Sequence, residues 1–226
     1  MIEHVYRRAT AARSVGAVVV ATDDDRIRQA VEAFGGHVRM TAAHHTSGTD
    51  RVAEVAASLD CELVVNVQGD EPLIEPAMID EAVAPLVSNP DLVMSTLCRR
   101  LDDPSLVASP HVTKVVVDRD GFALYFSRAP IPFARDAAPA APPCQHVGLY
   151  VYRRAFLLVF ARLAPTPLER TESLEQLRAL EHGVRIKVVE TTHQSIGVDT
   201  PEDLERVRRL IGARVRGEEH RDVQHR

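Results

Sequence analysis

Disulfide and thiolate chemistry have little support in this 226-residue sequence, which has three cysteines, no tryptophan and only 4% aromatic residues. Cys61, Cys98 and Cys144 are odd in number, far apart and without C-x-x-C spacing. This pattern argues against both a disulfide framework and a thiolate zinc site. We therefore expect a protein of the reducing cytoplasm.

Long hydrophobic runs and a large excess of either charge are also lacking. Residues 16–21 and 156–161 form the longest apolar stretches, far below the roughly 20 residues of a membrane span. No leader precedes the first helical pattern, so we expect neither membrane insertion nor export. The 27 Lys and Arg against 32 Asp and Glu give a net charge of −5, which argues against a polycation for nucleic acid. No nucleophile elbow, Walker loop or dinucleotide fingerprint is present.

Hydrophobic residues make up 45% of the chain, enough for one substantial domain. In the first half, strand-like and helix-like patterns alternate, which predicts an α/β fold with a mostly parallel sheet. The expected strands there are residues 17–21, 37–40, 63–67 and 92–97, and the expected helices are 2–9, 27–34, 49–59 and 76–87.

The middle of the chain has a different pattern. Residues 112–117, 123–126 and 147–152 read as strands without helices between them, so we expect antiparallel or mixed pairing, with a proline-rich loop at 130–143. Beyond them we expect helices at 155–163 and 172–182, a strand at 184–189 and a last helix at 201–211. We take 1–211 as one domain and the charged residues 212–226 as a frayed, disordered tail.

Asp70 follows the most strongly apolar run, residues 63–67, and would lie at the carboxyl end of a buried strand, where open α/β sheets bind ligands. Gly69 permits close approach of a ligand, and Pro72 delays helix entry. A turn-stabilising role and a magnesium or substrate role explain Asp70 about equally well.

Asp199 precedes a helix start in which Thr200 has the features of an N-cap, followed by Pro201, with Asp203 as capping-box partner. Capping leaves Asp199 without a structural role, and a carboxylate there could bind a hard cation. Spacing alone does not tell whether Asp70 and Asp199 meet.

Two further groups of polar residues could bind ligands. Ser47, Gly48 and Arg51 lie at an expected helix N-terminus and suit phosphate or nucleotide contacts, although capping by Ser47 or Thr49 is the ordinary explanation. Other polar residues share one face of an expected strand or helix and could bind a ligand there. Half-buried or solvent-exposed side chains with no ligand would give the same pattern. These are His146, Gly148 and Tyr150 near one strand, and Glu172 and Gln176, four apart in the expected helix 172–182.

Taken in order, seven motifs resemble the 3-deoxy-manno-octulosonate cytidylyltransferase (CMP-Kdo synthetase) family. The resemblance runs over the whole chain except its tail. The motifs are A-T-D at 21–23, T-S-G-T-D-R at 46–51, N-V-Q-G-D-E-P at 66–72, A-L-Y-F-S-R-A at 123–129, H-V-G-L-Y at 146–150, L-E-Q-L-R at 174–178 and G-V-D-T-P-E-D-L at 197–204.

The resemblance implies a three-layer, Rossmann-like nucleotide-diphospho-sugar transferase fold, with a mixed, mostly parallel sheet and a small antiparallel lobe for sugar binding and dimerisation. It implies transfer of CMP from CTP to the anomeric hydroxyl of Kdo, with release of pyrophosphate, for lipopolysaccharide synthesis. A homodimer is implied as well.

The resemblance also implies roles for individual residues. Asp70 and Asp199 would be catalytic ligands of Mg²⁺. Kdo would be held by Gln68, His146, Tyr150, Glu172 and Gln176, with Glu175 as an alternative to Glu172. The nucleotide would contact Thr22, Asp23, Ser47, Gly48 and Arg51.

One departure from the family pattern concerns the triphosphate. Members begin with a buried strand and a loop of the form P-A-R-x-x-S-x-R-L-P-G-K, to which no residue here corresponds. We therefore expect this chain alone to transfer little or no CMP, and a chain extended upstream to regain the activity. We also expect unpaired sheet edges to lower the stability of the protein. Two alternatives stay open: a non-catalytic sugar-acid-binding or dimerising remnant, and a cytidylyltransferase for another sugar acid, such as sialic acid or amino-substituted Kdo.

Overall fold

The computed structural model describes residues 1–45, 47–135, 141–198 and 200–224, with the backbone alone beyond Gly212. The helices are α1 Ile2–Thr10, α2 Asp25–Ala33, α3 Gly48–Ala57, α4 Pro76–Ser88, α5 Pro104–Ala108, α6 Arg154–Phe160, α7 Pro167–Glu172, α8 Gln176–Glu181 and α9 Pro201–Gln224. The strands are β1 Val20–Thr22, β2 Val38–Met40, β3 Leu63–Asn66, β4 Met94–Arg100, β5 Lys114–Val117, β6 Ala123–Ser127, β7 Cys144–Arg153 and β8 Lys187–Glu190.

Side-chain caps fix several helix starts. The carboxylate of Asp24 accepts from the Arg26 N–H at 2.7 Å at the start of α2, and the Ser47 hydroxyl accepts from the Asp50 N–H at 3.1 Å at the start of α3. At α9, the Asp203 N–H donates to the Thr200 hydroxyl, and the Thr200 N–H donates to the Asp203 carboxylate. This reciprocal pair confirms the capping box expected from the sequence.

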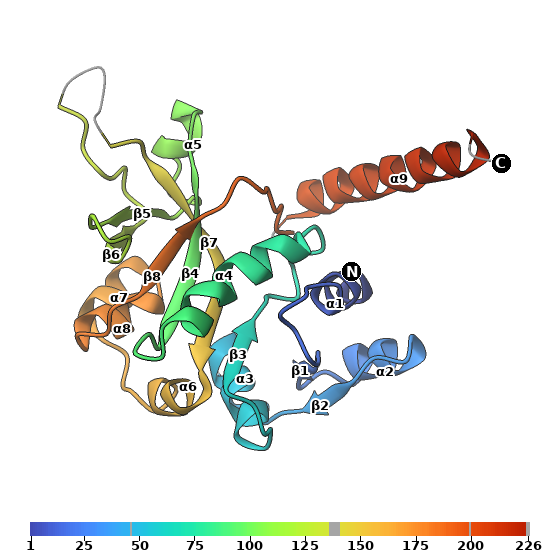
Figure 1. The fold of residues 1–226 in the computed structure, drawn as a ribbon, viewed down its shortest axis with the longest axis horizontal. Helices are drawn as coiled ribbons and strands as arrows, with labels where there is room; N and C mark the ends of the chain where they lie inside the picture. The colour runs from blue at the N-terminus through green and yellow to red at the C-terminus, as the bar shows by residue number, and fades with distance from the viewer. Residues whose placement is uncertain (46, 136–140, 199, 225–226) are drawn as a thin grey trace.

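The main sheet is mixed, as expected, and β7 is its central strand (Figure 1). One edge of β7 pairs antiparallel with β4, and the other pairs antiparallel with β5 and β3. β4 also pairs in parallel with β8, and β5 pairs antiparallel with β6. The expectation of mostly parallel pairing is corrected for a simple reason: β3, β4 and β8 do share one direction, but β7 lies between β3 and β4 and runs the opposite way.

The first strand pair stands apart from this sheet. β1 and β2 form a separate two-stranded parallel sheet whose register starts at Val20 and Val38. The strand expected at residues 17–21 is therefore displaced to Val20–Thr22, because the ladder that defines it begins only at Val20.

Two expected helical segments also differ from the structure. The helix expected at 172–182 is two helices, because Ser173 adopts φ 53° and ψ 49° between the end of α7 and the start of α8. A left-handed residue ends an α-helix, so the regular spacing does not continue across Ser173. The last helix, expected to end at 211, continues to Gln224.

Helices cover both faces of the main sheet, and side chains alternate along β7 between two cores. Leu149 and Val151 pack in the core under α1 and α4, whereas Tyr152 packs in the core with α3, α6 and α8. Within the described part of the chain, no helix is both long and apolar enough to cross a membrane.

Candidate functional site

The loop after β3 meets a segment more than 120 residues later in the chain. The Val198 N–H donates to the Asp70 carbonyl at 2.9 Å, and the Ser195 hydroxyl donates to the Glu71 carboxylate. A Cβ atom at Gly197 would lie 3.3 Å from the same carboxylate, so glycine permits this approach. The structure thus brings the Asp70 motif to the residue immediately before Asp199, and Asp199 itself lies outside the described residues.

A polar pocket of about 230 Å³ opens beside this junction. It is lined by Glu71, Arg99, Gln145, His146, Val147, Gly148, His193, Ser195, Gly197 and Asp203. Backbone and side chains of β7 therefore share one pocket with the loop that follows β3.

Gln68 is the first member of a chain of polar contacts that runs into the interior. Its amide nitrogen donates to the Asn66 side-chain oxygen at 3.0 Å, and the Asn66 amide nitrogen is 3.5 Å from the Thr49 hydroxyl. The Thr49 hydroxyl in turn donates to the Glu175 carboxylate. These contacts join the end of β3, the first turn of α3 and the α7–α8 connection into one cluster.

His146 is buried on β7, with its ring edge-on to Phe126 at 4.9 Å and 5.4 Å from the Tyr150 ring. Its Nε2 lies 3.0 Å from the Thr96 hydroxyl, whose own proton can go to the Leu149 carbonyl at 2.8 Å. Nε2 then carries the ring proton, and Nδ1 is left as an acceptor. Burial lowers the pKa of His146 to about 3, so the ring is neutral at pH 7. Burial, with smaller effects of Tyr152 and Glu175, raises the pKa of Tyr150 well above its ordinary value.

The acidic candidates Glu172 and Glu175 have different surroundings. Both carboxylate oxygens of Glu172 are bound at the end of β6, one by the Ser127 hydroxyl at 2.6 Å and one by the Arg128 N–H at 2.9 Å. Glu175 accepts from Thr49 through one oxygen, while its other oxygen is 3.6 Å from the Arg178 guanidinium, close enough for an ion pair but too far for a hydrogen bond. Burial raises the pKa of Glu175. The contacts of its carboxylate with hydroxyl groups and with Arg178 lower the pKa, but they do not offset the effect of burial.

Gln176 is nearly fully buried beside Glu175. Its amide nitrogen has no hydrogen-bond partner among the described residues. A buried donor without a partner costs free energy, so this nitrogen is positioned to bind an incoming acceptor. Because Ser173 separates α7 from α8, Glu172 and Gln176 do not share the single helix face that their spacing had suggested.

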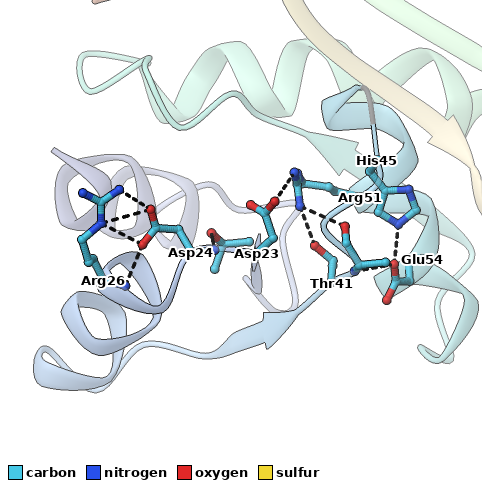
Figure 2. A network of polar contacts seen from close by, with 9 residues as sticks. Asp23, Asp24, Arg26, Thr41, His45, Arg51 and Glu54 are labelled. Carbon is cyan, nitrogen blue, oxygen red and sulfur yellow. Dashed lines mark hydrogen bonds and ion pairs between the residues drawn. The ribbon is translucent and has the colours of Figure 1, made fainter.

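Two of the residues expected to contact a nucleotide, Asp23 and Arg51, meet near the ends of β1 and β2 (Figure 2). One Arg51 guanidinium nitrogen is 2.8 Å from the Asp23 carboxylate, and another donates to the Thr41 hydroxyl at 2.9 Å. The buried Thr22 hydroxyl accepts from the Asp24 N–H at 3.1 Å. Because Asp23 balances the charge of Arg51, this pair presents donors and acceptors rather than a net positive charge. It therefore suits a base or a ribose better than a phosphate.

A metal centre made of protein side chains alone is not found in the described residues, where no three His, Cys, Asp or Glu side chains lie together for one. Mg²⁺ differs from zinc in that one or two carboxylates and substrate phosphates are enough to bind it. The oxygen donors near Asp70 fit a hard cation in this respect.

Three buried polar residues were not singled out as candidates from the sequence. Asn66 and Thr96 are buried in strands that are otherwise largely apolar, and a polar residue at such a position is a usable signal. Lys114 is also fully buried, and its ammonium donates to the carbonyls of Ser109 and Val112 at 2.8 and 2.6 Å.

Known proteins resemble the chain over most of its length. The cytidylyltransferase family matches residues 1–186. The 3-deoxy-manno-octulosonate cytidylyltransferase of Solibacter usitatus is 58% identical over 215 residues, covering 95% of this chain and 85% of the relative. That of Geobacter sulfurreducens is 60% identical over 217 residues, covering 92% and 87%. A solved CMP:2-keto-3-deoxy-manno-octonic acid synthetase complexed with CTP aligns with a TM-score of 0.90 and 43% identity, covering 94% of this chain and 88% of the other.

Proposed function

The chain belongs to the cytidylyltransferase family, and from that premise we propose that it transfers CMP from CTP to Kdo, releasing pyrophosphate, as a step toward lipopolysaccharide. The observation that carries the proposal is the convergence of the β3 end, the first turn of α3 and the α7–α8 connection on one set of polar contacts. The chain that carries these contacts is 58% and 60% identical to two proteins named 3-deoxy-manno-octulosonate cytidylyltransferase.

In this proposal, Kdo is held by Gln68, His146, Tyr150 and Gln176. Neutral His146 offers an acceptor and Gln176 an unpartnered donor, which suits a sugar with many hydroxyls. Between the two acidic candidates, Glu175 suits Kdo better, because both oxygens of Glu172 are already bound by Ser127 and Arg128. The anomeric hydroxyl then attacks the α-phosphate in line, which needs correct orientation more than covalent catalysis.

The nucleotide in this proposal contacts Thr22, Asp23, Ser47, Gly48 and Arg51. Asp70 and Asp199 would hold Mg²⁺, which when bound neutralises charge on the α-phosphate. In support, the Asp70 carbonyl accepts from the N–H of Val198, the residue that precedes Asp199 in the sequence. We further propose a homodimer that works in the cytoplasm, where three free thiols stay reduced.

The direct test is incubation of the protein with CTP, Kdo and Mg²⁺, with CMP-Kdo and pyrophosphate followed by phosphorus NMR. The two products should form in equal amounts and only with Kdo, and at a low rate, because no residue of this chain corresponds to the triphosphate loop of the family. Gln176→Ala should weaken Kdo binding by roughly 10- to 100-fold, since one buried hydrogen bond is lost. The exposed Gln194→Ala is the matched control, and an equal loss in both variants would contradict the assignment.

Sugar-acid binding without transfer is a second candidate function. It is favoured by one observation: Gly48, Arg51 and Gln68 line a large open cavity rather than a closed nucleotide site. Titration calorimetry separates the two functions, because binding of Kdo with no binding of CTP supports the second and excludes the first.

A further inference from the structure

The ladder between β4 and β7 is interrupted by a bulge. Thr96 pairs with Tyr150, and the residue that follows Thr96 pairs with Val147, so one step along β4 corresponds to three steps along β7. Residues 148–149 therefore lie opposite no residue of β4. Extra residues of this kind bend a strand and change the direction of the side chains beside them. Here the bulge lies between His146 and Tyr150, two residues of the proposed sugar site.

The bulge brings these two side chains together. The β4 partners of His146 and Tyr150 lie only two residues apart. The two residues of β7 are therefore separated by about 7 Å along the strand, instead of the roughly 13 Å of a regular strand. This shortening permits their rings to approach to 5.4 Å between centroids. A group that holds the bulge thus also holds the two rings beside each other.

Thr96 makes the side-chain contacts that hold the bulge. Its buried hydroxyl oxygen is 2.8 Å from the Leu149 carbonyl oxygen and 3.1 Å from that of Val147. The same hydroxyl oxygen lies 3.0 Å from Nε2 of His146. A hydroxyl has one proton to donate, and both carbonyls only accept, so the proton goes to a carbonyl and Nε2 donates to the hydroxyl. If the hydroxyl proton went to Nε2 instead, two carbonyl acceptors would face the hydroxyl oxygen with no proton between them.

The other ring nitrogen of His146, Nδ1, is left with a lone pair. Among the described residues, no hydrogen bond involves this nitrogen. The edge contact with Phe126, at 4.9 Å between centroids, restrains the ring as well. The ring therefore offers an acceptor in a fixed place, which suits a ligand hydroxyl that donates.

We propose that Thr96 is a positioning residue of the sugar site. Its hydroxyl holds the bulge of β7 and keeps the ring of His146 in the tautomer with the proton on Nε2, so that Nδ1 accepts from a hydroxyl of the bound sugar. Thr96 acts through His146 and does not touch the sugar itself. The part of this role that concerns the sugar rests on the proposed function, whereas the tautomer is a property of the protein without ligand. A sugar acid with a methyl ether in place of this hydroxyl cannot donate and is rejected.

The first test measures the tautomer of His146 in the nitrogen-15-labelled protein without ligand, from the chemical shifts of the ring nitrogens. The signals of this ring are identified by their loss in His146→Gln. We expect the wild type to carry the proton on Nε2. Thr96→Val removes the hydroxyl with little change of volume and should shift the ring toward the form protonated on Nδ1. Thr96→Ser keeps a hydroxyl and should retain the wild-type tautomer.

Ser95→Ala is the matched control for these variants. Ser95 is fully buried as well, and its hydroxyl donates to the Ala82 carbonyl at 2.6 Å on the opposite face of β4. This control loses a buried hydrogen bond but should keep the wild-type tautomer. If Thr96→Val does not fold, Thr96→Cys takes its place, because a thiol of similar size is only a weak acceptor. A wild-type ring protonated on Nδ1, or the wild-type tautomer in the folded variant that lacks the hydroxyl, would overturn the proposal.

Kdo binding, measured by titration calorimetry, gives a second readout. Thr96→Val should weaken binding by about tenfold or more, since the hydrogen bond from the sugar to Nδ1 is lost. Thr96→Ser and Ser95→Ala should bind within about twofold of the wild type, because both leave the acceptor in place. Equal weakening in Thr96→Ser and Thr96→Val would overturn the role of the hydroxyl. Absence of Kdo binding by the wild type would contradict the proposed function, and the spectra without ligand would still decide the tautomer.

Discussion

His146 shows how a single residue can be tuned by burial alone. Its lowered pKa has a single cause, the desolvation of the ring by burial. A neutral imidazole with a fixed tautomer is a hydrogen-bonding group, rather than an acid or base, at physiological pH. This agrees with a role in orienting a sugar and not in moving a proton.

Burial of His146 predicts a pH dependence of stability. The unfolded chain takes up a proton on this residue below about pH 6.5, whereas the folded chain does so only near pH 3. The free energy of unfolding should therefore decrease as pH falls through this window, by up to about 1.4 kcal/mol per pH unit from this residue. Urea unfolding at a series of pH values measures it. His146→Gln should flatten the slope relative to wild type, and the exposed His111→Gln should not; identical slopes in all three would contradict the prediction.

The thiols of Cys98 and Cys144 give a second prediction. The neighbouring Cys98 thiol is the main cause that lowers the pKa of Cys144, with help from Arg100, whereas burial and Glu190 act in the opposite direction. The rate of alkylation of Cys144 by iodoacetamide should therefore reach half of its maximum at a lower pH than that of an ordinary thiol. Cys98→Ala should move the midpoint up toward the ordinary value of about 8.5, whereas Cys98→Ser keeps a donor and should move it less. An unchanged midpoint in Cys98→Ala would show that another group sets the pKa.

Residue types were a better guide to local structure than residue spacing was. The order of seven motifs indicated which side chains to consider, and the capping box at Thr200 and Asp203 is confirmed. The shared face of Glu172 and Gln176 could not be predicted, because the left-handed backbone of Ser173 has no strong sequence signal. The contact between Asn66 and Thr49 could in principle have been predicted, since polar residues in buried segments need hydrogen-bond partners.

At the scale of elements, the α7–α8 pair positions the two acidic candidates, Glu172 and Glu175. The two short helices are joined by a nearly buried ion pair, with Arg178 Nε 2.8 Å from the Glu169 carboxylate and the Arg178 side chain only 8% exposed. Arg178 also lies 3.6 Å from Glu175. The position of Glu175 therefore depends on the pairing of α7 with α8.

Glu169→Ala should destabilise the protein by about 3–5 kcal/mol, because it leaves a buried guanidinium without its main partner. Replacing both partners, as Glu169→Leu with Arg178→Met, should recover much of this loss. Chemical unfolding of the single and double variants measures the coupling. A double variant that loses as much as the sum of the single variants would show that the ion pair contributes nothing specific.

Most helices and strands could be predicted within a few residues, and the exceptions have physical causes. β7 was expected as a short strand at 147–152, but long-range pairing with β3, β4 and β5 extends it to Cys144–Arg153. The direction and placement of β7 depend on which edges are free, and local periodicity carries no information on that. β1, by contrast, is short because only one of its edges pairs with another strand, β2, among the described residues.

At the scale of the whole molecule, the β5–β6 end carries exposed apolar residues. Leu124 on β6 is 61% exposed, and Phe133 in the following loop is 88% exposed. Contiguous exposed apolar patches mark protein interfaces, and these two side chains are candidates for such a patch. Leu124 and Phe133 are therefore the residues at which the interface of the proposed homodimer can be tested.

Leu124→Glu and Phe133→Glu should each shift the protein from dimer to monomer, since a charge would be buried without a partner in the interface. Light scattering over a range of protein concentrations measures the shift. Val159→Glu, on α6 and 57% exposed, is the matched control and should leave the dimer intact. Dissociation by Val159→Glu alone would place the interface elsewhere.

The central position of β7 has a consequence for biosynthesis. β3 and β4 are made early, but the strand that joins them lies at Cys144–Arg153, so neither can complete its ladder until about two thirds of the chain has been made. Until then, both present open apolar edges as the chain leaves the ribosome. Sheet closure is therefore a late, long-range event, and the nascent chain passes through a period in which its folding depends on avoiding association with its neighbours.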